Sequence, residues 1–272
     1  MILHQMKAHR FLRPLPLLAS VLILAAPVIS PAFAQTQATV LPDDASKFPP
    51  LNQLPGKPPP YVWDGLAGLW SRRHNTWKAT ATNDAGSVVF LGDSITQGWN
   101  TLARDFPKLK VANRGISGDI SSGVLYRLKA DVLSLNPVAV ILLIGTNDLG
   151  DGEDADDVAG NIKLILQAIQ AGNPKIKVIV CKTMPRAERD GAEFKPVYAG
   201  KIQRVNSLVE DFVKTQPEFA ICDTWGAFAD DKGNPNPGEF NPDHLHLNPA
   251  GYEVWRKTLD PVLVKMNLET AH

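Results

Sequence analysis

The sequence lacks an excess of charge of either sign, holds little cysteine, and has no apolar run long enough to span a membrane. Its 28 basic residues balance its 28 acidic residues, so the charge gives no indication of nucleic-acid binding. The longest apolar stretch, residues 15–29, is shorter than the ~20 residues that a spanning helix needs. The remaining composition is close to that of ordinary globular proteins, and nothing in it indicates repeats or disorder.

The first 34 residues have the features of a secretory signal peptide. Three basic residues, Lys7, Arg10 and Arg13, precede the apolar stretch, and the Ala-Phe-Ala sequence at 32–34 is typical of a cleavage site. We therefore expect residues 1–34 to be removed on export to the periplasm or the medium, with no stable membrane insertion afterwards. The alternative is a membrane anchor, which the shortness of the apolar run disfavours. No cysteine lies near the cut to carry a lipid.

Cleavage would leave 238 residues with 25 basic and 28 acidic side chains, a net charge of −3. That length is sufficient for one sizeable α/β core. Residues 35–62 are rich in proline, and we expect them to form a linker or an extended arm. Residues 63–272 are expected to form a single domain that begins with a packing helix.

Three tryptophans at a seven-residue spacing open this domain. Trp63, Trp70 and Trp77, together with Leu66 and Leu69, predict an amphipathic helix. A platform that stacks against sugars is one interpretation of the tryptophans. A seven-residue interval is also what a buried helical face produces, so we favour packing against the domain.

Apolar runs then alternate with longer amphipathic stretches along the chain. The runs predict strands at residues 87–92, 109–113, 138–144, 176–182 and 219–223, and the stretches predict helices at 121–133, 155–171, 195–214 and 249–266. Mostly continuous apolar strands are typical of a parallel sheet that is buried on both faces. Right-handed crossovers then give a three-layer α/β/α sandwich with a doubly wound, flavodoxin-like sheet of five parallel strands. Active sites in such folds lie at the carboxyl ends of the strands.

The only two cysteines, Cys181 and Cys222, lie at the ends of two of these predicted strands. An oxidising compartment would permit a disulfide if the two strands were neighbours. Two buried thiols are the alternative, which we favour.

The first strand runs directly into Gly92-Asp93-Ser94, a turn that can present a hydroxyl. Serine is a weak nucleophile unless a base lies within hydrogen-bond reach. Asp243 and His246, three residues apart in a loop near the C-terminus, can supply the base and the carboxylate that orients it. We therefore predict Ser94 as nucleophile, His246 as base and Asp243 as orienting acid.

Donors for an oxyanion follow the next two strands. Gly118 has no Cβ, so its N–H can approach a ligand closely. The Asn147 amide can donate to the same oxygen as the N–H groups of Ser94 and Gly118; the alternative for Asn147 is a local turn. Asp119 is interpreted as the N-cap of the next helix rather than as a catalytic group.

Two acidic segments invite a metal interpretation. Asp243, His244 and His246 are of the right residue types, but a site there needs further ligands at other strand ends. The acidic run at residues 151–157 lacks the ligand register of a calcium loop. We expect neither a metal nor another cofactor.

Together these blocks resemble the SGNH hydrolases, also called GDSL esterases and lipases. The blocks occur in the family's order: Gly92-Asp93-Ser94, Gly118, Gly145-x-Asn147-Asp148 and Asp243-x-x-His246. Ile95 stands where the family's nickname has leucine. The segments 113–119 and 124–128 are similar to the platelet-activating-factor acetylhydrolase catalytic-subunit branch and its bacterial relatives. The resemblance implies a Ser-His-Asp esterase with an oxyanion hole, and the branch implies short acyl groups such as acetyl.

We therefore expect an exported serine esterase that acts on short-chain, chiefly acetyl, esters of small molecules or glycans. Fewer than two dozen residues separate Ser94 from Gly118, which leaves no long insertion to cover a fatty chain. A lysophospholipase or thioesterase and a non-catalytic glycan-binding protein are the alternatives. Loops containing residues 184–186 and 225–236 are expected beside the leaving group, with Arg186 solvated at the surface. The sequence indicates no nucleic-acid partner and no particular oligomeric state.

Overall fold

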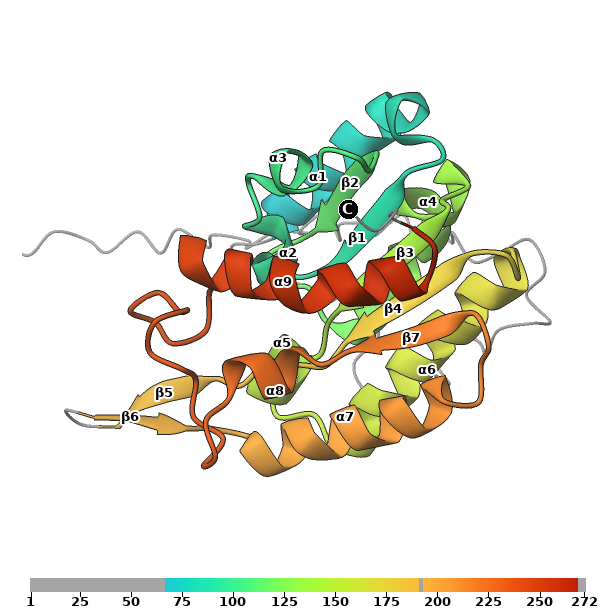
Figure 1. The fold of residues 1–272 in the computed structure, drawn as a ribbon. Helices are drawn as coiled ribbons and strands as arrows, with labels where there is room; N and C mark the ends of the chain where they lie inside the picture. Colours follow the sequence, from blue (N-terminus) through green and yellow to red (C-terminus); the bar gives the residue numbers. More distant parts are fainter. Residues whose placement is uncertain (1–66, 191–192, 269–272) are drawn as a thin grey trace, which may run out of the picture. The chain divides into compact units, whose positions relative to one another are not determined.

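The structure is a computed structural model that describes residues 67–190 and 193–268. Five parallel strands form a sheet at the centre of this part of the chain (Figure 1). The expectations for residues 1–34, residues 35–62 and Trp63 lie outside these residues. The spatial order of the strands is β2-β1-β3-β4-β7. Their bounds are Val88–Gly92 (β1), Val111–Gly115 (β2), Ala139–Leu143 (β3), Lys177–Cys181 (β4) and Phe219–Cys222 (β7).

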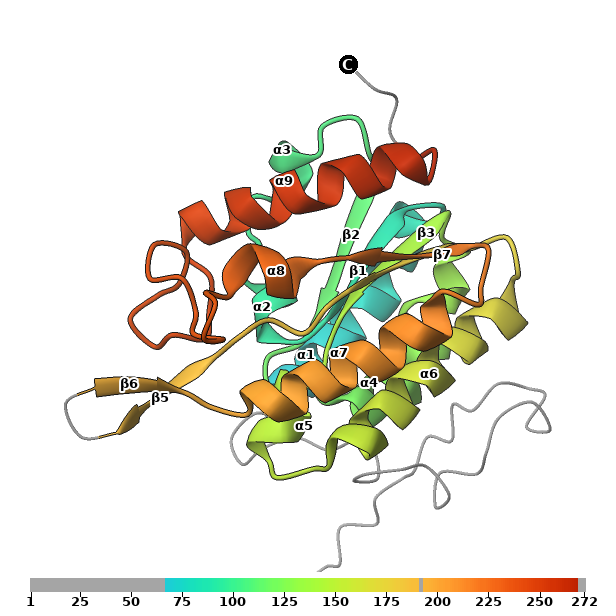
Figure 2. The ribbon, with the colours of Figure 1, turned by 60° about the horizontal axis from the view of Figure 1, so that its bottom comes forward.

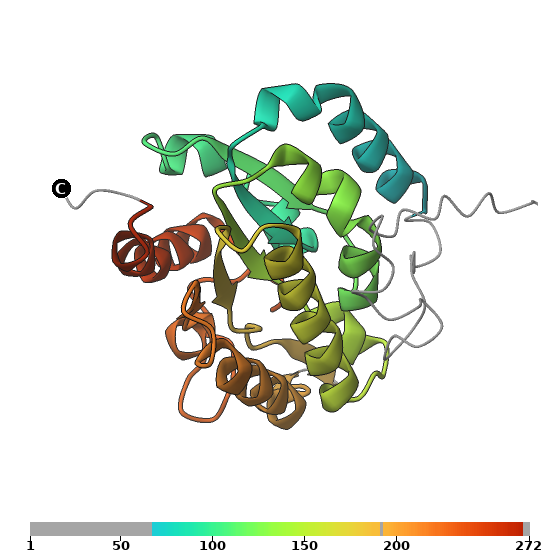
Figure 3. The ribbon, with the colours of Figure 1, turned by 90° about the vertical axis from the view of Figure 1, so that its right-hand side faces the viewer.

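Helices cover both faces of this sheet (Figures 1 and 2). One face carries α4 (Ser121–Asp131), α6 (Ala155–Gly172) and α7 (Ala199–Val213), and the other carries α3 (Leu102–Asp105), α8 (Thr224–Phe228) and α9 (Pro249–Lys265). In Figure 3, red α9 lies across the sheet from green α4 and yellow-green α6. No helix among the described residues has both the length and the apolarity of a membrane span.

Alternate residues of each strand pack against different helix layers, as the two-residue period of a strand requires. In β1, Val89 and Leu91 belong to the apolar cluster under α4, α6 and α7, whereas Val88 and Phe90 belong to the cluster under α9. Both clusters are buried, which is why the strands read as continuous apolar runs. The predicted three-layer, doubly wound fold is confirmed.

The first helix, α1 (Ala67–Thr80), packs against α4. Trp70 and Trp77 are buried in a small cluster with Ile116. The guanidinium of Arg114 lies 5.0 Å from the centre of the Trp77 ring. For these two tryptophans the packing interpretation is therefore confirmed, and the sugar-stacking one is not.

The second strand begins and ends two residues later than predicted, at Val111 and Gly115. The observed strand includes Arg114, although a charged residue is unusual inside a buried strand. Here the Arg114 side chain is only 2% exposed, but its Nη2 lies 2.7 Å from Asp84 Oδ2 and its Nε donates to the Asp131 carbonyl at 3.0 Å. The ion pair with Asp84, which is distant in the sequence, thus allows a charged residue to lie inside a buried strand.

A hairpin occupies the start of the helix predicted at 195–214. Strands β5 (Ala187–Asp190) and β6 (Glu193–Pro196) pair antiparallel and project beyond the sheet in Figure 1. Tyr198 then adopts a left-handed conformation, with φ of 59°, and α7 begins only at Ala199. The prediction for the first residues of this helix was wrong because residues 195 and 196 pair in a strand with Glu188 and Ala187.

Cys181 and Cys222 are register partners at the ends of the neighbouring strands β4 and β7. Both are buried, and both are free thiols in the structure. The geometry therefore agrees with the thiol interpretation.

Candidate active site

Ser94 is the first residue of α2 (Ser94–Gln97), so the carboxyl end of β1 leads directly to its hydroxyl. The backbone of β1 packs closely against the end of β3 here, because a Cβ on Gly92 would lie 2.2 Å from the carbonyl oxygen of Leu143. Asp93 closes the turn by accepting a hydrogen bond from the Ile95 N–H at 2.9 Å. The glycine and the aspartate of this motif therefore act on the backbone that carries the serine.

His246 joins Ser94 and Asp243 in a row of hydrogen bonds. Its Nε2 lies 2.8 Å from Ser94 Oγ, and its Nδ1 lies 2.7 Å from Asp243 Oδ2. Partial burial acts to raise the pKa of Asp243, but hydrogen bonds from the His246 ring and from the N–H groups of His246 and Leu245 outweigh it and hold that pKa below its ordinary value. Asp243 is therefore ionised at neutral pH, as a carboxylate that orients an imidazole must be.

Backbone hydrogen bonds hold the loop that carries this pair. The N–H of Asn241 donates to the His246 carbonyl at 2.7 Å, and the N–H of His244 donates to the Asn241 carbonyl at 2.9 Å. His244 has a φ of 53°, in the left-handed region, and its carbonyl accepts from the Ala187 N–H at the start of β5 at 3.1 Å. The hairpin thus anchors a strained residue between Asp243 and His246.

The two other predicted oxyanion donors follow β2 and β3. Gly118 has a φ of 77°, a conformation that glycine adopts without strain. Its loop is tied to the turn at Ser94 by a hydrogen bond from the Ser117 N–H to Gln97 Oε1 at 2.8 Å. Asn147 lies in α5 (Thr146–Gly150), where its Nδ2 donates one hydrogen to the Asp119 carbonyl at 2.8 Å. That bond orients the amide and leaves its second hydrogen for a ligand.

Asp119 is not the N-cap of α4, which is Ile120. Its fully buried carboxylate instead accepts from Arg127 Nε at 2.7 Å. Arg127 also donates to the carbonyls of Gly92 and Arg114, at 3.1 and 2.9 Å. The guanidinium therefore joins the ends of β1 and β2 just before Ser94 and Gly118, a role that needs residues far apart in the sequence.

The start of α4 is capped from outside the helix. The carboxylate of Asp148, which follows Asn147, accepts from the Ser121 N–H at 3.0 Å and from the Ser121 hydroxyl. Burial raises the pKa of Asp148 to about 6, against the lowering effect of these hydrogen bonds. A tertiary contact thus replaces the local capping that the sequence suggested for Asp119.

Asp93 is the third buried acid under the site. Its Oδ1 accepts from Ile95, while its Oδ2 has no hydrogen-bond partner within the described part of the chain. Burial raises the pKa of Asp93 to about 7, with a further contribution from the charges of Asp119 and Asp148. The folded protein therefore retains a proton on Asp93 that the unfolded chain releases near pH 4.

Replacing Asp93 by Asn is expected to change the pH dependence of stability. Between about pH 4 and pH 7 the folded wild type binds one more proton at this site than the unfolded chain, so this group makes stability fall as pH rises. Asn removes that dependence and keeps an oxygen for the Ile95 N–H. The free energy of unfolding of D93N minus that of the wild type should therefore increase from about pH 4.5 to about pH 7.5, measured by urea denaturation.

The exposed Asp156 gives a control for this measurement. Its pKa is lowered by the hydrogen bonds from Arg204, so its folded and unfolded values both lie below about pH 4.5. The difference between D156N and the wild type should stay level over the same range. A level difference for D93N as well would show that Asp93 is ionised in the folded protein.

Arg186 is a buried residue, not the solvated one that we expected. It is 8% exposed and lies against the Tyr198 ring. Its Nη1 donates to the Thr146 carbonyl at 3.1 Å, and its Nη2 lies 2.6 Å from Glu188 Oε1. Because Ala187 holds the His244 carbonyl, the segment at 186–187 connects the Asn147 turn with the loop of His246. No local pattern in the sequence indicates this link.

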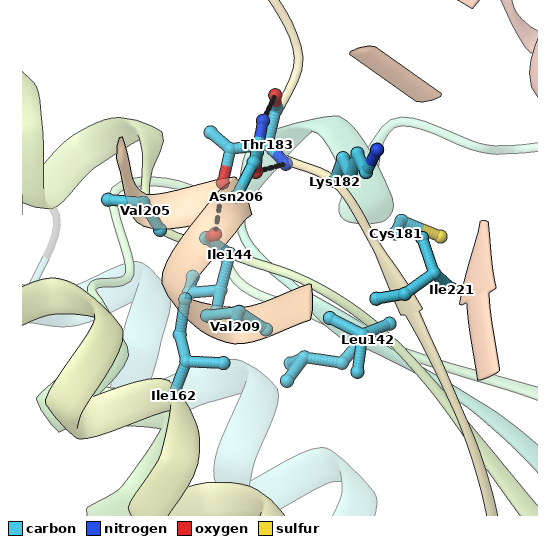
Figure 4. A pocket seen from close by; sticks show the side chains of 11 residues that line it. Leu142, Ile144, Ile162, Cys181, Lys182, Thr183, Val205, Asn206, Val209 and Ile221 are labelled. Carbon is cyan, nitrogen blue, oxygen red and sulfur yellow. Dashed lines mark hydrogen bonds between the residues drawn. The ribbon is translucent and has the colours of Figure 1, made fainter. Parts of the chain in front are cut away.

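Asn206 on α7 makes a similar connection to the segment that follows β4 (Figure 4). Its amide accepts from the Thr183 N–H at 2.7 Å and donates to the Thr183 carbonyl at 3.0 Å. The Thr183 hydroxyl in turn donates to the Ile144 carbonyl at 3.1 Å. The adjoining cavity of about 10 Å³ has room for about one water and is too small for a substrate. The hydrogen bonds of Asn206 and Thr183 therefore hold the ends of β3 and β4 together.

The described residues contain no group of three or more His, Cys, Asp or Glu side chains placed to hold a metal ion. Asp243 and His246 instead bond to each other. In the acidic run, Asp154 and Asp156 pair with Lys201 and Arg204 of α7. These contacts agree with a structural role for the run.

The fold and the site match known proteins. Residues 90–254 match the model of the GDSL-like lipase/acylhydrolase family. The chain is 30% identical over 206 residues to the platelet-activating factor acetylhydrolase IB subunit alpha1 of Pongo abelii, covering 73% of this chain and 84% of that protein.

Two solved structures are similar to this one. A GDSL-like lipase from Bacteroides thetaiotaomicron superimposes with a TM-score of 0.62 at 27% identity, covering 71% of this chain and 97% of that chain. An acetyl xylan esterase superimposes with a TM-score of 0.54 at 25% identity, covering 65% of this chain and 98% of that chain. The family match spans more than half of the sequence and includes the segments of Ser94, Gly118, Asn147, Asp243 and His246. The chain therefore belongs to the GDSL-like lipase/acylhydrolase family and is a carboxylic ester hydrolase.

Proposed function

We propose that the protein is an exported esterase that removes acetyl groups from carbohydrates through a serine nucleophile. The observation that carries the chemistry is the hydrogen-bonded row of Ser94, His246 and Asp243. Export is proposed from the signal-peptide pattern of residues 1–34. The acetyl preference is supported by the names of two similar proteins, an acetylhydrolase and an acetyl xylan esterase.

In the proposed reaction, His246 takes the proton of Ser94 as its Oγ attacks the ester carbonyl carbon. The carbonyl oxygen becomes an oxyanion that accepts from the N–H groups of Ser94 and Gly118 and from the amide of Asn147. His246 then gives its proton to the leaving oxygen, and the acyl group stays on Ser94. Water, deprotonated by the same imidazole, then attacks the acyl carbon, and His246 returns the proton to Ser94 Oγ as the acid leaves. Asp243 stabilises the imidazolium throughout.

A series of p-nitrophenyl esters of increasing acyl length tests this function. We expect kcat/KM to be highest for the acetyl ester and to fall with each added pair of methylenes, because no long insertion follows Ser94 to cover a chain. The rates are to be measured spectrophotometrically on the purified full chain and on S94A. A maximum above about eight carbons would favour a lysophospholipase or thioesterase instead. Equal rates for S94A and the wild type would contradict the serine mechanism.

A further inference from the structure

Asn147, the side-chain amide at the site, lies in a helix of only five residues, α5. An isolated helix of this length is not stable in water, so contacts from elsewhere in the fold must fix the position of its side chains. The bond from Asn147 Nδ2 to the Asp119 carbonyl orients the amide itself. A second contact, on the backbone of α5, comes from Arg186 in the segment that follows β4.

The Arg186 guanidinium lies against the backbone of α5. Its Nη1 donates to the carbonyl of Thr146, the first residue of the helix, at 3.1 Å. That carbonyl belongs to the peptide unit that joins Thr146 to Asn147, so the bond fixes the backbone directly before the Asn147 Cα. A Cβ on Gly150, the last residue of the helix, would lie 2.8 Å from the same Nη1. The guanidinium therefore occupies space that any larger residue at position 150 would need.

The hairpin β5–β6 holds Arg186 in turn. The Arg186 Nη2 lies 2.6 Å from Glu188 Oε1 in β5. The N–H of the next residue, Ala187, donates to the His244 carbonyl at 3.1 Å, in the loop that carries His246. The residue that contacts α5 is therefore fixed to the same hairpin that anchors the loop of the base.

Stability and substrate contact do not account for this arrangement. Arg186 Nε is buried without a hydrogen-bond partner among the described residues, and an unpartnered buried donor weakens a fold. A cleft of about 520 Å³ opens beside Ser94 and His246. Its described lining includes neither the segment at 184–186 nor that at 225–236, which the sequence suggested for the leaving group. An effect of Arg186 on the reaction must therefore pass through the residues that it contacts.

We propose that Arg186 is a positioning residue for ester hydrolysis, which acts through the Thr146 carbonyl to hold the Asn147 amide at the oxyanion. The proposal rests on the proposed serine mechanism and adds a residue to it. An amide stabilises an oxyanion strongly only when it is already aimed at it before the reaction begins. A displacement of about 1 Å can lower a rate by about 10²-fold. Loss of the guanidinium should therefore slow the reaction although no group that touches the substrate is removed.

Replacing Arg186 by Met keeps much of the side-chain volume and removes the donors. We expect kcat on p-nitrophenyl acetate to fall by about 10- to 100-fold, with KM changed by less than about threefold, because the bound ester has no oxyanion yet. R204M is the matched control, since Arg204 on α7 has an exposed guanidinium, and it should keep the wild-type kcat. A wild-type kcat for folded R186M would overturn the proposal.

A double-mutant cycle with N147A separates positioning from a general structural effect. Removal of the amide should itself lower kcat by about 10²–10³-fold. Because Arg186 acts through Asn147, R186M/N147A should match N147A alone within about twofold. An equal loss for R186M in both backgrounds overturns the proposal, since Arg186 then acts through another group. If N147A keeps the wild-type kcat while S94A is inactive, the proposal fails and the serine mechanism stands. If S94A matches the wild type, the proposed function fails as well.

Gly150 offers a second variant, which leaves Arg186 in place. The new Cβ of G150A must displace the flexible end of the arginine from α5, while alanine favours the helix more than glycine does. We expect G150A to lower kcat by about threefold or more and to add no further loss to R186M. G200A is its control, because no atom lies within 4 Å of a Cβ built there. Thermal unfolding checks that each variant is folded in the assay. Should R186M fail to fold, a wild-type kcat for G150A overturns the proposal.

Discussion

Replacing Ser94 by Ala is expected to lower kcat on p-nitrophenyl acetate by about 10⁴-fold or more. The substitution removes only Oγ, the atom that lies 2.8 Å from His246 Nε2, and it leaves the turn at Asp93 intact. Without Oγ no acyl-enzyme forms, and His246 has no nucleophile to activate. Steady-state rates, together with labelling by a fluorophosphonate and intact mass measurement, check both the rate and the site of the covalent step.

Ser134 provides the matched control. It is exposed in the short 3-10 helix Leu133–Leu135, and its hydroxyl donates to the Ala130 carbonyl. S134A should therefore keep the wild-type rate and take up one phosphonate. Persistent labelling of S94A at the wild-type rate would assign the nucleophile to another residue.

Replacing Arg127 by Met is expected to destabilise the fold by about 3–5 kcal/mol. The side chain is fully buried, and its loss leaves the Asp119 carboxylate without its cation. It also leaves the carbonyls of Gly92 and Arg114 without this donor. Thermal unfolding should show a decrease in Tm of about 6–20 °C, since about 1 kcal/mol shifts Tm by ~2–4 °C in a domain of this size.

Two further variants separate the ion pair from a general effect of the substitution. R104M removes a guanidinium that is 77% exposed, and it should leave Tm almost unchanged. The double variant D119N/R127M should be more stable than R127M alone, because it no longer buries an uncompensated carboxylate. A double variant less stable than R127M would mean that Asp119 stabilises the fold through contacts other than Arg127.

The central strands were predictable because they are buried on both faces. Each is a short, continuous apolar run, and such runs bounded by loops are a strong local signal. The boundary of β2 was missed because Arg114 is neutralised by Asp84, thirty residues away in the sequence. The hairpin β5–β6 was missed because its strands carry charged residues, such as Glu188 opposite Lys195, and therefore show no apolar pattern. The short helices α2 and α5 lie below the length at which a helical period can be recognised.

The residues of the candidate site were predictable because each has a local motif at a strand end or in the C-terminal loop. Their supports were not. Arg127, Arg186 and Asn206 act on backbone groups 13 to 40 residues away in the sequence, and no local pattern distinguishes them from surface residues. Asp119 was misassigned for the same reason. An aspartate just before a helix suggests an N-cap, and nothing in the local sequence shows that its carboxylate pairs with the buried Arg127.

By itself, the sequence determined the class of fold and the identities of the nucleophile, base, orienting acid and amide donors as predictions, because apolar period and motif spacing are local properties of a chain. Only the tertiary structure decided that Ser94 and His246, 152 residues apart, lie within a hydrogen bond of each other. It also decided that a cleft opens beside these two residues. Both depend on how the strands are ordered and on which side chains are desolvated together, and these are properties of the packed molecule rather than of any segment.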